Sequence, residues 1–277
     1  MTRPLLAIDG DSLAHRAYHA LPKTIRRAEG RAAGAIVGFT NMLLRLWENE
    51  RPRTVVVGWD TLESPTYRHQ LYAGYQAGRE FDDALLEQLD LLPELVRAFG
   101  FAAAKGAGYE ADDFLAAAVA QEEARGGTTL VVTSDRDSFQ LASERTTILQ
   151  STRGVRELAR IGPREVRERY GVEPAQVPDF IALRGDPSDR LPGAKGVGPK
   201  TAADVLRQYG TLEGALAAGR FAAQAEELRM YLRMATLDAA APVPSLDDQP
   251  PAWAEASSFV RELGLNALAD RLAALTD

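Results

Sequence analysis

The chain has 277 residues, of which 45% are apolar and 26% charged, so it is long enough to bury a sizeable core and has an ordinary globular composition. It contains no cysteine, which excludes disulfide bonds and thiolate metal sites. No run approaches the roughly 20 apolar residues of a membrane-spanning helix, and the opening MTRPLLAIDGDS meets acids too early for a signal peptide. We therefore expect a soluble protein with no membrane partner, located by default in the cytoplasm.

The formal net charge of −7 counts, at first sight, against a nucleic-acid partner, because phosphate binding usually needs a basic surface. Net charge is summed over the whole molecule, however, whereas binding depends on the local field. An acidic total fits a carboxylate-lined metal site equally well. The positions of the acids along the chain therefore decide between the two interpretations.

The first half of the chain alternates short apolar runs with helical patterns. Runs rich in Val, Ile, Leu and Thr predict strands at 5–8, 54–59, 129–133 and 146–149. Helix-spaced apolar residues predict helices at 33–48, 84–99 and 111–124. This alternation indicates an α/β fold with a mainly parallel central sheet flanked by helices.

The second half changes to short helical segments separated by Pro and Gly. Helices are predicted at 163–170, 174–183, 199–209, 211–217, 222–236 and 257–274. The Pro- and Asp-rich stretch 239–251 is predicted to be a loop, and the last helix to pack back on the body. We divide the chain into an α/β core at 1–160 and a helical lobe at 161–277.

Acids gather where strands and helices are predicted to meet. Asp9, Asp60 and the pair Asp135 and Asp137 follow three strands, and the carboxyl ends of strands are the usual site of an open α/β sheet. Two further groups lie elsewhere: Glu110, Asp112 and Asp113 are predicted at the start of a helix, and Asp186 and Asp189 in a turn between two helices. Each group alone is explained by capping or turn formation.

Together these acids favour a metal site. Converging carboxylates repel one another unless they are protonated or bridged by cations. An all-oxygen site suits hard ions such as Mg²⁺ or Mn²⁺, and the three histidines show no zinc-ligand spacing. No Gly-rich loop followed by Lys and Ser or Thr is present, which argues against an NTPase. A paired-metal site that hydrolyses a phosphodiester is the interpretation we prefer.

The segment LPGAKGVGPKTAADVLRQYG predicts a DNA-binding hairpin. Gly196 and Gly198 allow close approach of the backbone, and Pro199 starts a helix whose free N–H groups, with Lys195 and Lys200, form a phosphate cradle. Such an element contacts the backbone of DNA and not its bases. The alternative is an ordinary helix–turn–helix with surface lysines.

A second candidate is the segment LYAGYQAGRE. Tyr72 and Tyr75 are placed to stack on bases, and Arg68 and Arg79 to reach phosphates. A solvated helix face is an equally good explanation of this segment taken alone.

The motifs, in their order, resemble the bacterial 5′-nuclease family. They are IDGDSLAHRAYHA, the strand ending at Asp60, GYEADD, TSDRDSFQL and LRGDPSDRLPGAKGVGPKTA. This family comprises the N-terminal 5′-nuclease domain of DNA polymerase I and free-standing flap endonucleases. The resemblance implies a PIN-like 5′-nuclease fold, a helical arch at about 66–92 and a helix–three-turn–helix at about 174–210.

The resemblance also implies a ligand set. The family's first metal cluster corresponds to Asp9, Asp60, Glu110 and Asp112. Its second corresponds to Asp135, Asp137 and Asp186, with Asp112 shared between the two ions. Asp113 and Asp189 correspond to additional acids of bacterial members. All nine are present, which favours an active enzyme.

Further residues match positions near the substrate. Arg16, Tyr75 and Arg79 correspond to groups at the scissile phosphate and the arch. The hairpin from Gly196 to Thr201 corresponds to the duplex-binding element, which in relatives also holds a K⁺ ion. Two departures stand out: Gln76 replaces the usual arch lysine, and Asp11 replaces a small polar residue.

The implied function is a structure-specific 5′-nuclease, both 5′-3′ exonuclease and flap endonuclease. Its substrates are DNA with 5′ ends, flaps or nicks, including RNA–DNA hybrids of lagging-strand primers. The chain ends without a polymerase domain, so we expect a free-standing, monomeric, nucleoid-associated protein recruited by a DNA polymerase or a sliding clamp. Two alternatives remain: a PIN-type ribonuclease, and a non-catalytic flap-binding protein suggested by Gln76.

Overall fold

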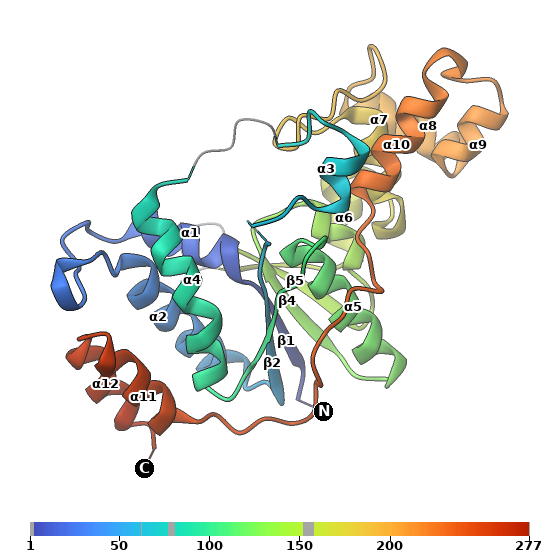
Figure 1. The fold of residues 1–277 in the computed structure, drawn as a ribbon. Coiled ribbons are helices and arrows are strands. Elements are labelled where there is room, and N and C mark those ends of the chain that lie inside the picture. Colours follow the sequence, from blue (N-terminus) through green and yellow to red (C-terminus); the bar gives the residue numbers. More distant parts are fainter. Residues whose placement is uncertain (1–2, 62, 77–80, 152–157, 277) are drawn as a thin grey trace.

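The computed structural model describes residues 3–61, 63–76, 81–151 and 158–276. In this part of the chain, six strands form one sheet with the order β3-β2-β1-β4-β5-β6 (Figure 1). The strands are β1 Leu5–Asp9, β2 Thr54–Gly58, β3 Ala102–Ala104, β4 Thr129–Thr133, β5 Thr146–Ser151 and β6 Leu158–Ile161. The first five strands are parallel to one another, and only β6 is antiparallel, to β5, which confirms the predicted mainly parallel sheet.

Helices cover both faces of the sheet: Figure 1 shows α1, α2 and α4 on one side and α5 on the other. The helices are α1 Gly10–Ala20, α2 Gly34–Glu50, α3 Tyr67–Leu71, α4 Asp83–Ala98, α5 Ala111–Ala124, α6 Pro163–Tyr170, α7 Val177–Arg184, α8 Pro199–Tyr209, α9 Leu212–Ala217, α10 Ala225–Ala235, α11 Trp253–Glu262 and α12 Asn266–Ala273. Short 3₁₀ turns occur at Ala28–Gly30, Asp137–Leu141, Pro174–Gln176 and Ala222–Gln224. No helix of the described residues is both long and apolar enough to cross a membrane.

The side chains of β1 alternate between two hydrophobic clusters, because successive residues of a strand point to opposite faces. Leu5 and Ala7 pack with α5 and with the lobe, whereas Leu6 and Ile8 pack with α1, α2, α4 and the C-terminal helices. All four are fully buried. Burial on both faces explains why the central strands are continuous apolar runs in the sequence.

The lobe helices α6 to α10 have no separate core. Phe180 of α7 and Leu206 of α8 belong to the same hydrophobic cluster as Phe114 of α5. The lobe is therefore packed on the sheet side that carries α5. The division at 160 and 161 stays a prediction.

The chain returns to the α/β core after the lobe. Within the segment 236–252, the N–H of Gln249 donates to the carbonyl of Arg53 at 3.0 Å, and Arg53 Nη1 donates to the carbonyl of Leu246 at 2.7 Å. At the start of α11, the Trp253 ring lies 5.9 Å from that of Phe99. Figure 1 shows α11 and α12 beside α2 and α4.

The predicted single helix at 257–274 is wrong. Gly264 adopts a φ of 78°, which favours glycine and ends α11, so two helices, α11 and α12, replace it. Three elements had no counterpart in the prediction, namely α1, β3 and β6, whereas α3 lies within the segment predicted as a helical arch. β3 is three alanines, which have low strand propensity, and α1 follows β1 without an intervening loop, so neither left a separate signal.

Candidate active site

Three neighbouring strands end in acids at one edge of the sheet. β1 ends in Asp9, Asp60 lies two residues after β2, and Asp135 lies two residues after β4. Because β1 pairs in parallel with both β2 and β4, the three ends lie side by side. This is the crevice outside the carboxyl ends of the strands, where open α/β sheets usually bind ligands.

Backbone and hydroxyl donors orient the first two acids. The Asp9 carboxylate caps α1 by accepting from the N–H of Ser12 at 2.9 Å, and it also accepts from Thr133 Oγ1 at 2.8 Å. Asp60 accepts from the N–H of Ala111, the first residue of α5, at 2.8 Å. Both carboxylates are therefore held by neighbouring elements of the core.

Gly58 lets α5 begin close to β2. A Cβ at position 58 would lie only 2.5 Å from the carbonyl oxygen of Ala111, so glycine is required there. This close approach brings the start of α5, with Glu110 and Asp112, to the edge where Asp60 lies.

The remaining acids come from β4 and from the lobe. The N–H of Asp137 donates to Asp135 Oδ1 at 2.9 Å, which fixes the turn after β4. Asp186 and Asp189 lie in the loop after α7, where Asp186 accepts from the N–H of Ser188 at 2.7 Å. The loop therefore carries two acids from the lobe to the sheet edge.

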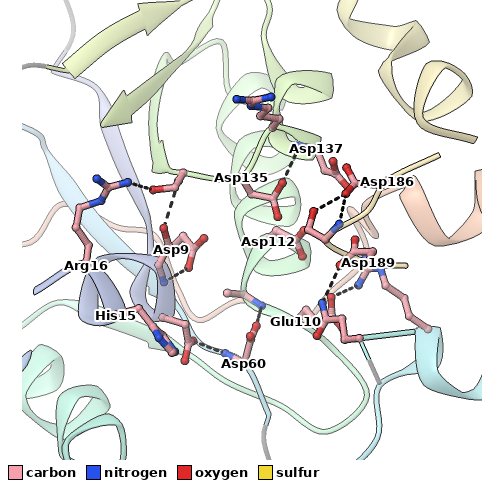
Figure 2. Close-up of a pocket in the computed structure, with 18 of the residues that line it drawn as sticks. Asp9, His15, Arg16, Asp60, Glu110, Asp112, Asp135, Asp137, Asp186 and Asp189 are labelled. Atoms are coloured by element: carbon pink, nitrogen blue, oxygen red, sulfur yellow. Dashed lines mark hydrogen bonds and ion pairs between the residues drawn. The ribbon is translucent and has the colours of Figure 1, made fainter. Parts of the chain in front are cut away.

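Eight of the nine predicted acids line one cavity of about 1260 Å³. They are Asp9, Asp60, Glu110, Asp112, Asp135, Asp137, Asp186 and Asp189. Figure 2 shows Asp112 at the centre, between Asp135 and Glu110. Its Oδ1 atom is buried and has no hydrogen-bond partner in the described residues, although a buried carboxylate oxygen normally has one.

Burial, together with repulsion between neighbouring acids, raises the pKa values of several of these carboxylates. Burial, with the nearby charges of Asp60 and Asp135, raises the pKa of Asp9 to about 7. Burial raises the pKa of Asp189 to about 6, with contributions from Asp135 and Asp186. The pKa of Asp112 is raised well above its usual range by burial and by its acidic neighbours. Buried carboxylates in this state are stabilised by bound protons or by bound cations.

The residues present fit divalent cations. All eight acids offer oxygen ligands, and the unpartnered Oδ1 of Asp112 is a buried ligand atom with nothing else to bind. Among the described residues, no group of three His, Cys, Asp or Glu side chains is already placed to hold an ion. Carboxylate side chains would therefore have to turn toward an ion as it binds.

Asp113 does not line the cavity, contrary to its place in the predicted ligand set. It is fully buried and accepts from Arg68 Nη1 and Nη2, both at 2.8 Å, and from the N–H groups of Glu110 at 3.1 Å and Asp238 at 2.9 Å. All of its accepting capacity is used within the fold. Asp113 therefore lies outside the cavity and fixes the backbone of Glu110 by accepting from its N–H.

The prediction that Arg68 reaches a DNA phosphate is also wrong. Its side chain is 2% exposed, because Asp113, Glu110 and the carbonyl of Met234 occupy its donors. A guanidinium held in this way links α3, α5 and the end of α10. The sequence alone did not reveal the acidic partners with which the Arg68 guanidinium is buried.

Tyr75 is buried and does not present its ring for stacking on a base. Its hydroxyl donates to Glu110 Oε2 at 2.8 Å and accepts from Gln76 Nε2 at 2.9 Å. Gln76 Nε2 also donates to Asp189 Oδ1 at 3.1 Å, so this amide links Tyr75 to an acid of the lobe. The predicted arch residue Arg79 lies outside the described residues.

Arg16 lines the cavity, and its Nη2 donates to Ser134 Oγ at 2.6 Å. Asp11 also lines it, and its Oδ2 accepts from the N–H of Asp60 at 2.7 Å. Sequence reasoning missed Arg136, which lies between two predicted ligands in TSDRD and lines the same cavity. The position of Arg136 between two acids was a signal that could have identified it.

The predicted hairpin lies apart from this cavity, at the far end of the loop that carries Asp186. Gly198 and Pro199 start α8 as expected, and Gly196 has a φ of 76°. The exposed residues of the hairpin are Lys195, Gly196, Gly198, Lys200 and Thr201, and none of them lines the acid cavity. This surface is open to a partner.

Fold and cavity together define an α/β protein with an all-oxygen acidic site at the carboxyl edge of its sheet. The chain belongs to the 5′-3′ exonuclease family: the model of the "N-terminal resolvase-like domain" matches residues 4–171, and that of the "C-terminal SAM fold" matches residues 172–252. The family predicted from the order of the motifs is thereby confirmed.

Individual relatives agree with this assignment. DNA polymerase I of Mycobacterium leprae is 45% identical over 216 residues, which is 77% of this chain and 24% of that protein. The chain thus spans about a quarter of the length of this curated relative.

Solved structures confirm the predicted fold class. A bacteriophage T5 flap endonuclease in a pseudo-enzyme-product complex with DNA and metal ions superposes with a TM-score of 0.71, at 18% identity and 98% coverage of each chain. Flap endonuclease-1 from Methanococcus jannaschii superposes with a TM-score of 0.62, at 16% identity, covering 98% of this chain and 92% of that one.

Proposed function

We propose that this protein is a structure-specific 5′-nuclease that hydrolyses phosphodiester bonds of DNA at 5′ ends and at the base of 5′ flaps. The observation that carries this proposal is the convergence of eight of the nine predicted metal-ligand carboxylates on one cavity, in a chain of the 5′-3′ exonuclease family. A flap endonuclease of the same fold, from bacteriophage T5, was solved with DNA and metal ions.

The proposed cofactors are two divalent ions, Mg²⁺ or Mn²⁺. The proposed ligands of the first are Asp9, Asp60, Glu110 and Asp112, and those of the second are Asp112, Asp135, Asp137, Asp186 and Asp189. When bound, such ions supply an activated water and stabilise the charge that develops on the phosphoryl oxygens. Asp113 is left out because its oxygens are occupied within the fold.

The other residues have supporting roles in this proposal. Ser12 and Thr133 orient Asp9, while Tyr75 holds Glu110 through its hydroxyl. Arg16, at the cavity wall, is proposed to bind the scissile phosphate. We further propose cytoplasmic, nucleoid-associated action as a monomer, recruitment by a DNA polymerase or sliding clamp, and a K⁺ ion at the hairpin.

Cleavage of a 5′-labelled double-flap DNA tests the proposal. We expect the wild-type protein in Mn²⁺ or Mg²⁺ to cut near the flap junction and Asp135→Asn not to cut, because a ligand charge is lost. An RNA flap of the same sequence serves as the comparison that detects a PIN-type ribonuclease. Binding of the flap without cleavage in either metal would favour the non-catalytic alternative.

Removal of divalent ions is expected to abolish cleavage and to lower the melting temperature. Bound ions relieve the repulsion among the carboxylates, and an ion at 100 times its Kd adds about 2.7 kcal/mol to the free energy of unfolding. The measurement is thermal unfolding in EDTA and in Mn²⁺, with NaCl at matched ionic strength as the control. Cleavage that persists in EDTA would contradict the metal mechanism.

Replacing both hairpin lysines, Lys195→Ala and Lys200→Ala, is expected to weaken DNA binding equally for all sequences. Each lost contact to duplex phosphate should flatten the dependence of log Kd on log salt concentration by about 0.9. Cleavage at saturating DNA should be retained, because neither lysine lines the cavity. Arg207→Ala is the matched control, since Arg207 lies at the other end of α8 and pairs with Asp204; a loss as large in the control would contradict the assignment.

A further inference from the structure

Four arginines in the described residues line the acid cavity, and they differ in what holds their guanidinium groups. They are Arg16, Arg68, Arg136 and Arg184. The donors that each arginine already uses within the protein decide how much of its guanidinium is left for a substrate phosphate.

Three of these arginines are engaged. Arg16 donates to Ser134, and Arg68 is buried against Asp113 and Glu110. Arg184 Nη2 lies 3.3 Å from Asp186 Oδ2, and its Nε donates to the adjacent carbonyl of Gly185 at 3.0 Å.

Arg136 is the exception. Its side chain is exposed, and in the described part of the chain it makes no hydrogen bond or ion pair, although acids precede and follow it. The turn itself uses one of the nearby acceptors, because Asp135 Oδ1 accepts from the N–H of Asp137, and Asp137 is buried.

Among the described residues, the cavity lining at position 76 supplies no positive charge. Gln76 is neutral, and its amide is used by Tyr75 and Asp189. A phosphate chain entering a cavity that ten acidic side chains of the described residues line needs positive charge on the protein in addition to bound ions. Arg136 is placed to supply it.

We propose that Arg136 binds a backbone phosphate of the DNA strand held in the cavity, next to the phosphodiester that is hydrolysed. The proposal rests on the proposed function. A guanidinium suits this role because its donors match phosphate oxygens in pairs and its charge is permanent. A contact of this kind adds affinity without base specificity.

The test is the salt dependence of double-flap DNA binding in EDTA, for the wild type, Arg136→Gln, Arg136→Lys and Arg97→Gln. Arg97 is an exposed arginine of α4 that does not line the cavity and serves as the matched control. We expect Arg136→Gln to weaken binding about tenfold and to flatten the log–log salt slope by about 0.7–0.9. Arg136→Lys should keep most of the slope, and Arg97→Gln all of it.

Thermal unfolding at increasing Mn²⁺ concentration distinguishes phosphate binding by Arg136 from a role in which its charge only balances the carboxylates. If Arg136 only balanced the carboxylates, Arg136→Gln would shift the Mn²⁺ concentration that stabilises the protein against heat and would leave the DNA salt slope unchanged. That result overturns the proposal, as does an unchanged slope with unchanged Mn²⁺ binding. If the wild type neither binds nor cuts flap DNA, the proposed function fails as well. If the wild type binds and cuts flap DNA and Arg136→Gln binds it with the same salt slope, only the inference about Arg136 fails.

Discussion

Asp112→Asn is expected to reduce flap cleavage about a thousandfold or more while leaving flap binding within about twofold. Asp112 lies at the centre of the cavity, between the acids of the core and those of β4, and its Oδ1 has no partner in the described residues. Asparagine keeps the shape of the side chain but removes the charge that an ion needs, and about 4 kcal/mol of lost transition-state stabilisation corresponds to this factor.

The measurement is single-turnover cleavage of a double-flap DNA at saturating enzyme, with binding followed separately in EDTA. Asp90→Asn, at an exposed carboxylate of α4, is the matched control and should cut like the wild type. We expect Asp112→Asn to unfold at the same or a higher temperature in EDTA, because it removes a buried charge surrounded by like charges. Retention of more than a tenth of wild-type cleavage would contradict the role of Asp112.

Arg68→Met is expected to lower the free energy of unfolding by about 3–5 kcal/mol, the usual result of removing one partner from a buried ion pair. Asp113 is fully buried, and Arg68 provides two of its hydrogen bonds. Without the guanidinium, Asp113 and Glu110 remain in the interior with no cation beside them. Urea unfolding at neutral pH, analysed by linear extrapolation, measures the loss.

The double variant Arg68→Met with Asp113→Asn tests the mechanism of this loss. It should be more stable than Arg68→Met alone, because no unpaired charge stays buried at position 113. Arg164→Met, which removes an exposed pair with Glu165, should leave stability unchanged. A double variant less stable than Arg68→Met would show that packing around the guanidinium, and not the uncompensated charge, dominates.

The fold could largely be predicted because its signals are local. Two-sided burial makes β1, β2 and β4 continuous apolar runs, and Pro199 and Gly198 mark the start of α8 in the chain itself. The edge strands were missed because each is stabilised by its neighbour more than by its own residues: β3 is all alanine, and β6 depends on pairing with β5.

The candidate site was predictable for a topological reason. In a parallel sheet all strands end at the same edge, so acids after β1, β2 and β4 must meet there once the order of the strands places these three side by side. The sequence by itself therefore determined that Asp9, Asp60 and Asp135 lie at one edge of the sheet, and the order of its motifs determined the family, whereas the strand order of the folded sheet placed the three acids side by side.

Only the tertiary structure decided which neighbouring charges face the cavity. Asp112 and Asp113 are adjacent at the start of α5, yet one lies in the cavity and the other binds Arg68 behind it, since consecutive helical residues point in directions about 100° apart. Arg68 and Arg136 have the same side chain, but one is buried among acids and the other is unpaired. These differences arise from contacts between segments far apart in the sequence, such as Arg68 with Asp113 and Met234, and no local pattern records them.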